Sequence, residues 1–140
     1  MAFLLDTCVW IDVERAVLAP GDVAVLTRGE EVYLSPVTLA ELRFGAEIAA
    51  PALRQQRLAA LARIETRPLL SIDRTTGLVF GSLTAQLHLS AHRHRARVQD
   101  LWLASQAIQH GCSLLTRNVR DFDDLPGLQV EPYALRPRPS

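Results

Sequence analysis

Short apolar runs alternate with segments of helical spacing along this chain, and this alternation constrains the fold more than any other feature. Strands that alternate with helices build right-handed β-α-β crossovers and a parallel sheet that helices cover on both faces. We therefore predict an α/β fold with a mainly parallel central sheet. The predicted strands are residues 2–5, 32–34, 69–72, 112–115 and 128–130.

The segments between these runs carry apolar residues at the spacing of an amphipathic helix. Pro51 is typical of a first helical residue, and Gly111 is typical of the left-handed residue that follows a helix. The predicted helices cover residues 9–17, 22–28, 37–48, 51–64, 75–91 and 100–108, with a further helical turn at 121–122.

The 140 residues have the length of one domain. We expect that domain to cover residues 1–134, followed by a disordered tail rich in arginine and proline at 135–140. No apolar stretch reaches the roughly 20 residues that a transmembrane helix needs, and the first ten residues lack the basic start of a signal peptide. We therefore expect a cytoplasmic protein with no membrane partner.

All fifteen basic residues are arginine, and the formal net charge is zero. A neutral chain is not drawn to polyanions as a whole, so any nucleic-acid binding must be local. The lack of lysine excludes lysine-dependent chemistry, including that of phosphoacceptor folds with a lysine beside the phosphoryl group. Cys8 and Cys112 show neither zinc nor disulfide spacing, and we expect both to be buried thiols.

Acidic and amide side chains follow two of the predicted strands. Asp6 follows the first strand, and Asn118 and Asp121 follow the strand at 112–115. Ligands of open parallel sheets bind beyond the carboxyl ends of the strands. Glu41 and Asp100 lie in the opening turns of helices that begin at the same edge, so we expect these side chains to converge there. Each acid also has a simpler possible role, as a helix cap at Asp6 or as a partner of the helix dipole.

Clustered carboxylates repel one another, and this raises their pKa values unless a cation lies between them. Ligation by oxygen alone favours Mg²⁺, with Mn²⁺ as an alternative. A divalent metal neutralises a phosphate and activates a bound water. The predicted acidic edge therefore suits the hydrolysis of phosphodiesters.

Four motifs now carry a resemblance across the whole chain: Leu-Leu-Asp-Thr at 4–7, Ala-Glu-Leu-Arg-Phe-Gly at 40–45, Gln-Asp-Leu-Trp-Leu-Ala at 99–104 and Leu-Thr-Arg-Asn-Val-Arg-Asp-Phe at 115–122. Together they resemble a PIN domain of the VapC toxin class. The resemblance implies a PIN-like three-layer α/β/α sandwich and a magnesium-dependent endoribonuclease that acts on RNA. It also implies a toxin of a VapBC-type toxin–antitoxin system, with a cognate antitoxin, a homodimer and possible larger hetero-oligomers.

By position, Asp6, Glu41 and Asp100 match the three central acids of that family, with Asp6 and Asp100 as metal ligands. The fourth acid is open. Some relatives place an aspartate where this chain has Asn118, and others carry the acid where Asp121 stands. Asp121 would then supply charge, and Asn118 would orient a ligand or a water.

Thr7 and Thr116 match small hydroxyl positions that hold these carboxylates or the scissile phosphate. From their adjacency to Thr116 and Glu41, we predict that Arg117 and Arg43 pair with site acids or with RNA phosphate. The remaining aspartates lack motif partners, and we expect them at the surface or in turns. They are Asp12, Asp22, Asp73, Asp123 and Asp124.

The segment 92–97, His-Arg-His-Arg-Ala-Arg, departs from relatives that often have a glycine-containing loop before the third acid. It is either a contact for RNA or antitoxin or a solvated loop. Two other functions remain open at this point: a stand-alone PIN nuclease in RNA processing, and a non-catalytic binding module whose acids hold a metal.

Overall fold

The computed structural model describes residues 1–90 and 98–135. The basic segment 92–97 and, apart from Leu135, the predicted tail at 135–140 lie outside the described residues. In the part of the chain that the structure describes, no helix is long and apolar enough to cross a membrane.

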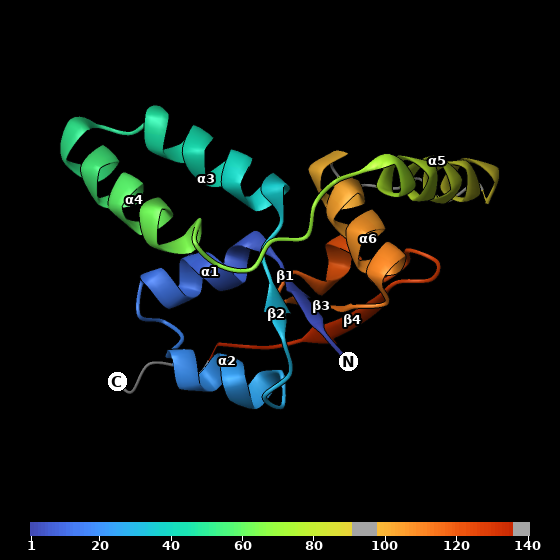
Figure 1. Cartoon of the computed structure of the whole chain (residues 1–140), viewed down its shortest axis with the longest axis horizontal. Coiled ribbons are helices and arrows are strands. Elements are labelled where there is room, and N and C mark those ends of the chain that lie inside the picture. Colours follow the sequence, from blue (N-terminus) through green and yellow to red (C-terminus); the bar gives the residue numbers. More distant parts are fainter. Residues whose placement is uncertain (91–97, 136–140) are drawn as a thin grey trace.

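One parallel sheet forms the centre of the fold, as the alternation of strands and helices predicts (Figure 1). Its strands are β1 Phe3–Leu5, β2 Val32–Tyr33, β3 Ser113–Thr116 and β4 Gln129–Pro132. They lie in the order β2-β1-β3-β4. The central strand β1 pairs on both sides, with Leu4 opposite Tyr33 in β2 and opposite Leu114 in β3.

The predicted helices are present, and their ends follow the expected local chemistry. Asp6, Ser35 and Asp73 each accept a hydrogen bond from a backbone N–H as helix N-caps. Gly111, with φ of 64°, follows the last long helix in the left-handed conformation. The helices are α1 Thr7–Glu14, α2 Pro20–Leu26, α3 Pro36–Glu47, α4 Pro51–Ile64, α5 Arg74–Leu89 and α6 Val98–His110, with a 3-10 turn η1 at Val119–Asp121.

Side chains of the sheet alternate between two hydrophobic cores, one on each face. In β1, Phe3 and Leu5 belong to the core shared with α1, α2 and α4, whereas Leu4 belongs to the core shared with α5 and α6. In β3, Leu115 and Leu114 divide in the same way. Helices thus cover both faces, which confirms the three-layer α/β/α arrangement.

The prediction of a strand at residues 69–72 is wrong. The strand is reduced to a single bridge between Leu69 and Leu34. Leu34 donates to the carbonyl of Pro68 and accepts from the amide of Leu70, but Ser35 then caps α3 and ends the neighbouring strand. Without a longer partner strand, a longer ladder cannot form at this edge.

Two helical lobes rise past the carboxyl ends of the strands, one built from α3 and α4 and the other from α5 and α6, and α6 also packs along one face of the sheet (Figure 1). Buried Gln106 of α6 joins them. Its Oε1 accepts a hydrogen bond from the Ser35 hydroxyl at the start of α3, and its Nε2 donates to the Leu70 carbonyl at 2.7 Å. This side chain therefore fixes the start of α3 relative to α6.

Candidate active site

Asp6 lies directly after β1 and caps α1, so its carboxylate stands at the carboxyl edge of the sheet. The side chain is buried, with 7% of its surface exposed. Oδ1 accepts from the backbone N–H of Thr7 at 2.8 Å, and Oδ2 accepts from the Thr116 hydroxyl at 2.7 Å. Both carboxylate oxygens are therefore oriented, one by a helix N-terminus and the other by the neighbouring strand.

Thr7 connects α1 with α3. Its hydroxyl lies 3.2 Å from Oε1 of Glu41, to which it donates, and 2.9 Å from the hydroxyl of Thr38. Thr38 is fully buried and lies one helical turn before Glu41. The structure therefore brings Asp6, Thr7 and Glu41 together, as the motifs predict.

Asp100 lies in the first turn of α6 and is buried, with 4% of its surface exposed. Gln106 of the same helix bonds Ser35, the N-cap of α3, and Glu41 lies further along α3, in its middle. Asp100 is therefore a buried acid in the first turn of its helix, and its place in the site stays a prediction.

Asn118 and Asp121 follow β3 and have exposed side chains. The amide N–H of Asn118 donates to Oγ1 of Thr116 at 3.0 Å, so the chain turns tightly at that threonine. Asp121 ends the 3-10 turn η1 that comes next. The backbone of Asn118 is therefore bonded to Thr116, the residue that binds Asp6, and the side chains of Asn118 and Asp121 are exposed to solvent.

Arg117 pairs with Asp12 of α1. Nε and Nη2 of the arginine lie 2.9 Å and 3.3 Å from the two carboxylate oxygens of Asp12, and the hydroxyl of Tyr133 donates to the same carboxylate at 2.8 Å. Asp12 is 3% exposed, so its predicted place at the surface is wrong. Arg43 forms an exposed ion pair with Glu47, one turn further along α3, at 3.0 Å.

These contacts shift three titrating groups beside the acids. The hydrogen bond to Asp12 raises the pKa of Arg117, and burial together with the hydrogen bond to Asp12 raises the pKa of Tyr133. Burial, and next the charge of Asp6, raise the pKa of the Cys8 thiol. Cys8 is therefore a protonated thiol at neutral pH and not a reactive thiolate, and both cysteines are buried, as predicted.

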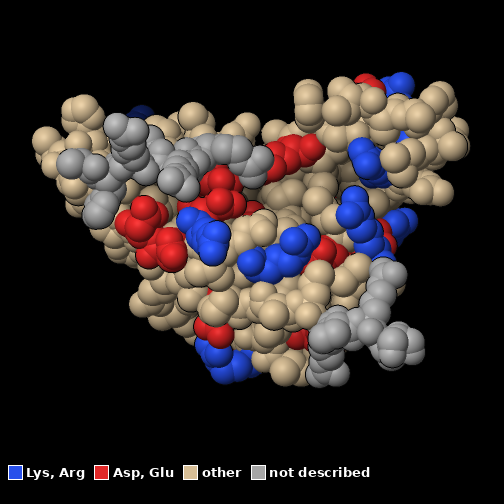
Figure 2. Space-filling model, turned by 180° about the vertical axis from the view of Figure 1, so that it is seen from behind, with Lys and Arg blue, Asp and Glu red and all other residues tan. Residues whose placement is uncertain are grey.

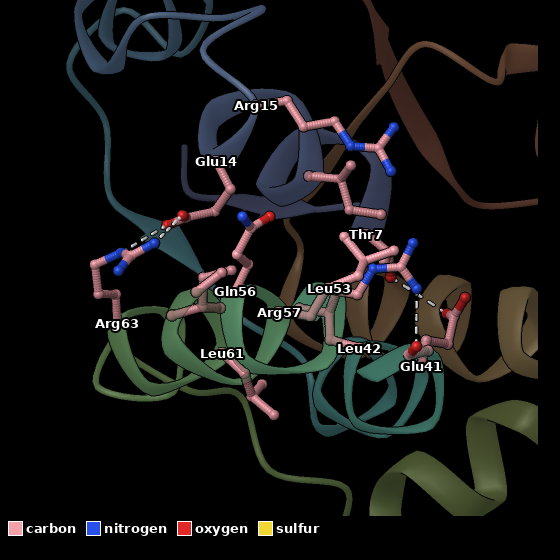
Figure 3. Close-up of a pocket in the computed structure, with 14 residues that line it drawn as sticks. Thr7, Glu14, Arg15, Glu41, Leu42, Leu53, Gln56, Arg57, Leu61 and Arg63 are labelled. Carbon is pink, nitrogen blue, oxygen red and sulfur yellow. Dashed lines mark hydrogen bonds and ion pairs between the residues drawn. The ribbon is translucent and has the colours of Figure 1, made fainter. Parts of the chain in front are cut away.

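A pocket of about 460 Å³ opens beside Thr7 and Glu41, between α1 and the pair α3 and α4. Figure 3 shows Thr7 and Glu41 at one end of this pocket and the ion pair of Glu14 with Arg63, at 2.6 Å, at its other end.

A view from behind shows how the charges are distributed around the hollow between the two lobes. Figure 2 shows acidic side chains around this hollow, with arginines below them. Charges of both signs therefore meet at this edge.

The donor set of the predicted acids suits a divalent cation. Asp6, Glu41 and Asp100 offer only carboxylate oxygens, which Mg²⁺ and Mn²⁺ prefer. Among the residues that the structure describes, no group of three or more His, Cys, Asp or Glu side chains is arranged to hold a metal. The convergence of the three acids on one ion therefore stays a prediction.

Sequence reasoning missed Thr38, Asp12 and Tyr133. Thr38 had a readable signal, because it precedes Glu41 by one helical turn and so shares its face. The sequence carries no signal for Asp12 and Tyr133, because their contact joins residues that are 121 positions apart.

Comparisons with known proteins agree with this geometry. The PIN domain family matches residues 3–128. The chain is 34% identical over 127 residues to Ribonuclease VapC5 of Mycobacterium tuberculosis, covering 90% of this chain and 89% of that protein. Ribonuclease VapC4 of the same organism is 30% identical over 128 residues, with 91% and 93% covered. The crystal structure of VapBC-5 from Mycobacterium tuberculosis, a member of the VapBC family of toxin–antitoxin systems, superposes with a TM-score of 0.74 and 29% identity, covering 94% of this chain and 98% of that one. The chain therefore belongs to the PIN-domain family and, within it, to the VapC type.

Proposed function

We propose that this protein is an endoribonuclease of the VapC type that hydrolyses RNA phosphodiester bonds with the help of Mg²⁺ and acts as the toxin of a toxin–antitoxin pair. The observation that carries the proposal is the buried, doubly hydrogen-bonded carboxylate of Asp6, linked through Thr7 to Glu41 at the carboxyl edge of the sheet. Relatives that share about a third of their residues are named ribonucleases, which supports it.

Asp6 and Asp100 would hold the metal, since both are buried acids at the starts of helices beside the sheet. Bound there, Mg²⁺ supplies positive charge for the scissile phosphate and lowers the pKa of a coordinated water. Mn²⁺ has the same preference for oxygen and is the alternative ion.

The protein's own residues orient the reaction. The Thr116 hydroxyl and the Thr7 amide fix both oxygens of Asp6, so the carboxylate keeps one direction without reorganisation. The Thr7 hydroxyl holds Glu41, which faces the pocket. Glu41 is placed to accept a proton from the attacking water at the edge where substrate enters.

The RNA would approach along the pocket between α1 and the α3–α4 pair. Arg15 and Arg57 line it, and Gln56 adds a side-chain amide. Arg57 is held by a hydrogen bond from Nη1 to the Gly45 carbonyl at 2.8 Å, which keeps its charge near the Glu41 end of the pocket. Asn118 and Asp121 follow β3 and are exposed, and in this proposal they act on the RNA from the β3 side of Asp6.

The partners follow from the same proposal. The similar VapBC-5 structure belongs to a toxin–antitoxin family, so a cognate antitoxin would bind and silence this protein. We further propose a homodimer, assembled with antitoxin into a larger complex in the cytoplasm.

The test compares Asp6→Asn with a matched control, Asp22→Asn. Asn caps a helix as well as Asp does, so Asp6→Asn should fold normally. Asp22 is also a capping carboxylate, bound to the Ala19 amide at 3.0 Å, but it caps α2 at the surface. We expect purified wild type and Asp22→Asn to cleave RNA in Mg²⁺ and to lose this activity when EDTA removes the metal. Both proteins should also inhibit growth when they are expressed in cells.

Asp6→Asn should neither cleave RNA nor inhibit growth, and its melting temperature should equal that of wild type. An Asp6→Asn protein that cleaves RNA at the wild-type rate would show that the proposed mechanism is wrong.

A further inference from the structure

The carboxylate of Asp12 is the meeting point of three parts of the fold. It lies on α1 and is 3% exposed. Arg117, directly after β3, binds both of its oxygens, and Tyr133, directly after β4, donates to Oδ2. A buried carboxylate is tolerated when charge and hydrogen bonds compensate for lost hydration, and both are present here.

We propose that Asp12, Arg117 and Tyr133 are positioning residues that clamp the segment after β3 onto α1 and so hold Thr116 against Asp6. The inference rests on the proposed function, because Asp6 is the central acid of that reaction. Asp12 and Tyr133 belong to none of the four motifs, and they act through Thr116 without touching RNA.

The clamp works because two neighbouring residues bind α1 at two points. Thr116 bonds the carboxylate of Asp6 at the N-terminus of the helix, and Arg117 bonds Asp12, six residues further along. Six helical residues span about 9 Å, so the two contacts fix the direction of the segment as well as its position. The ladder with β4 holds the backbone of Thr116, whose carbonyl accepts from the Tyr133 amide at 3.3 Å. Without the Arg117 contact, the residues after Thr116 would be free to pivot about it.

The amide of Asn118 extends the same arrangement. It donates to Oγ1 of Thr116 at 3.0 Å, while that hydroxyl donates to Asp6. Loss of the Arg117 contact would release the chain on which this amide lies. The positions of Asn118 and of Asp121 beyond it therefore depend on the Asp12 ion pair.

A second conclusion concerns Arg117 itself. Two of its guanidinium nitrogens bind Asp12, and its side chain is 36% exposed; the clamp assigns this arginine to the protein and not to RNA phosphate. Its loss should lower kcat, which depends on the alignment of Asp6, and should leave KM for RNA nearly unchanged.

The experiment uses Arg117→Met, which keeps an apolar stem and removes the charge, and Arg54→Met as the matched control. Arg54 forms an ion pair with Glu47 at 2.9 Å on the outer surface of the α3–α4 lobe and does not line the pocket. Two readouts are taken: kcat and KM for RNA cleavage, and hydrogen exchange of the Asn118 amide by NMR.

For Arg117→Met we expect kcat to fall by about tenfold or more, as for coupled neighbours in one network, with KM within about twofold. The Asn118 amide should exchange at least about tenfold faster, whereas the Asp6 amide, bonded to the Leu115 carbonyl, keeps its protection. Arg54→Met should match wild type in both readouts. If Arg117→Met does not fold, Asp12→Asn replaces it, because the asparagine retains a carbonyl acceptor for Tyr133.

Unchanged kcat and unchanged Asn118 exchange in a folded variant would overturn the clamp. A rise in KM alone would also overturn it and would make Arg117 an RNA contact. If wild type cleaves no RNA, the proposed function fails, and the exchange readout still decides whether the clamp holds Thr116.

Discussion

Asp6 and Asp121 are both acids that follow a strand of the central sheet, yet the protein treats them differently. Asp6 is buried, and hydrogen bonds hold both of its oxygens. Asp121 is exposed at the end of a 3-10 turn. The predicted site therefore has a buried part, which also includes Asp100 and Thr116, and an exposed part, which also includes Asn118.

The difference shows which part of the predicted site the fold holds rigid. A carboxylate out of water with fixed partners is pre-organised, so it keeps its direction when substrate arrives. An exposed carboxylate is screened by water and interacts weakly over the same distance. Substitutions in the buried part should therefore have much larger effects than those in the exposed part.

The largest expected effects are at Asp100, in the buried part, and at Glu41, which is half-buried and accepts from the Thr7 hydroxyl. Asp100→Asn and Glu41→Gln should each lower kcat by about 10²–10³-fold, the usual loss when one group that stabilises the transition state is removed. The measurement is RNA cleavage under single-turnover conditions. Asp123→Asn, an exposed acid beyond the site, is the control and should retain wild-type activity. Full activity in Asp100→Asn would remove that residue from the site.

Thr116→Val tests whether the buried part is held by hydrogen bonds. The hydroxyl serves the Asp6 carboxylate and the Asn118 amide at once, so its loss leaves a buried acceptor without its donor. We expect a loss of about 1–3 kcal/mol in the free energy of unfolding, measured with urea. The control is Thr84→Val, whose hydroxyl bonds two carbonyls of its own helix and which should be nearly neutral. Equal stability of the two variants would contradict the comparison.

A smaller effect is expected in the exposed part. Asp121→Asn should lower kcat only about five- to tenfold, because a unit charge at about 4 Å in water contributes about 1 kcal/mol. Adding Asn118→Asp to this variant shows whether the two positions share the role. Recovery of activity means that either position can supply the charge, and no recovery assigns it to Asp121. A loss as large as that of Asp100→Asn would erase the distinction between the two parts.

The smallest expected effect is a pH dependence of stability from Tyr133. Burial and the hydrogen bond to Asp12 raise its pKa in the folded protein, while an unfolded tyrosine titrates near its ordinary value of about 10. Above that pH the unfolded chain loses a proton that the folded protein keeps, so stability is full below about pH 10 and falls as the pH rises. Urea unfolding at pH 8 and pH 10.5 should show a loss of less than about 1 kcal/mol from this group. Tyr133→Phe should reduce that loss, and an unchanged loss would assign it to other groups.

The sequence was informative where a signal repeats along the chain. Alternating apolar runs gave the parallel sheet, and the position of Asp6 after the first run placed it at the carboxyl edge. The strand predicted at 69–72 failed because its composition says nothing about the length of its partner. Its neighbour ends where Ser35 begins to cap α3.

The buried polar contacts could not be predicted, because each depends on two residues that only the finished fold brings together. Ser35 meets Gln106 across 71 positions, and Asp12 meets Arg117 across 105. An aspartate in a first helix that ends in polar residues is usually solvated, so Asp12 gave no sign of its burial. The four motifs located the candidate site residues, whereas the contacts that fix their directions came only from the structure.

The amide of Asp6 donates to the Leu115 carbonyl at 3.0 Å and so continues the ladder between β1 and β3 by one residue. The central acid therefore belongs to the same cooperative unfolding unit as the middle of the sheet, which is the last part of such a fold to open. Fluctuations that expose α3 and α4 would move Glu41 while Asp6 keeps its place. Heat should then first weaken the enzyme reversibly, through the outer lobe, and destroy the position of Asp6 only when the whole domain melts.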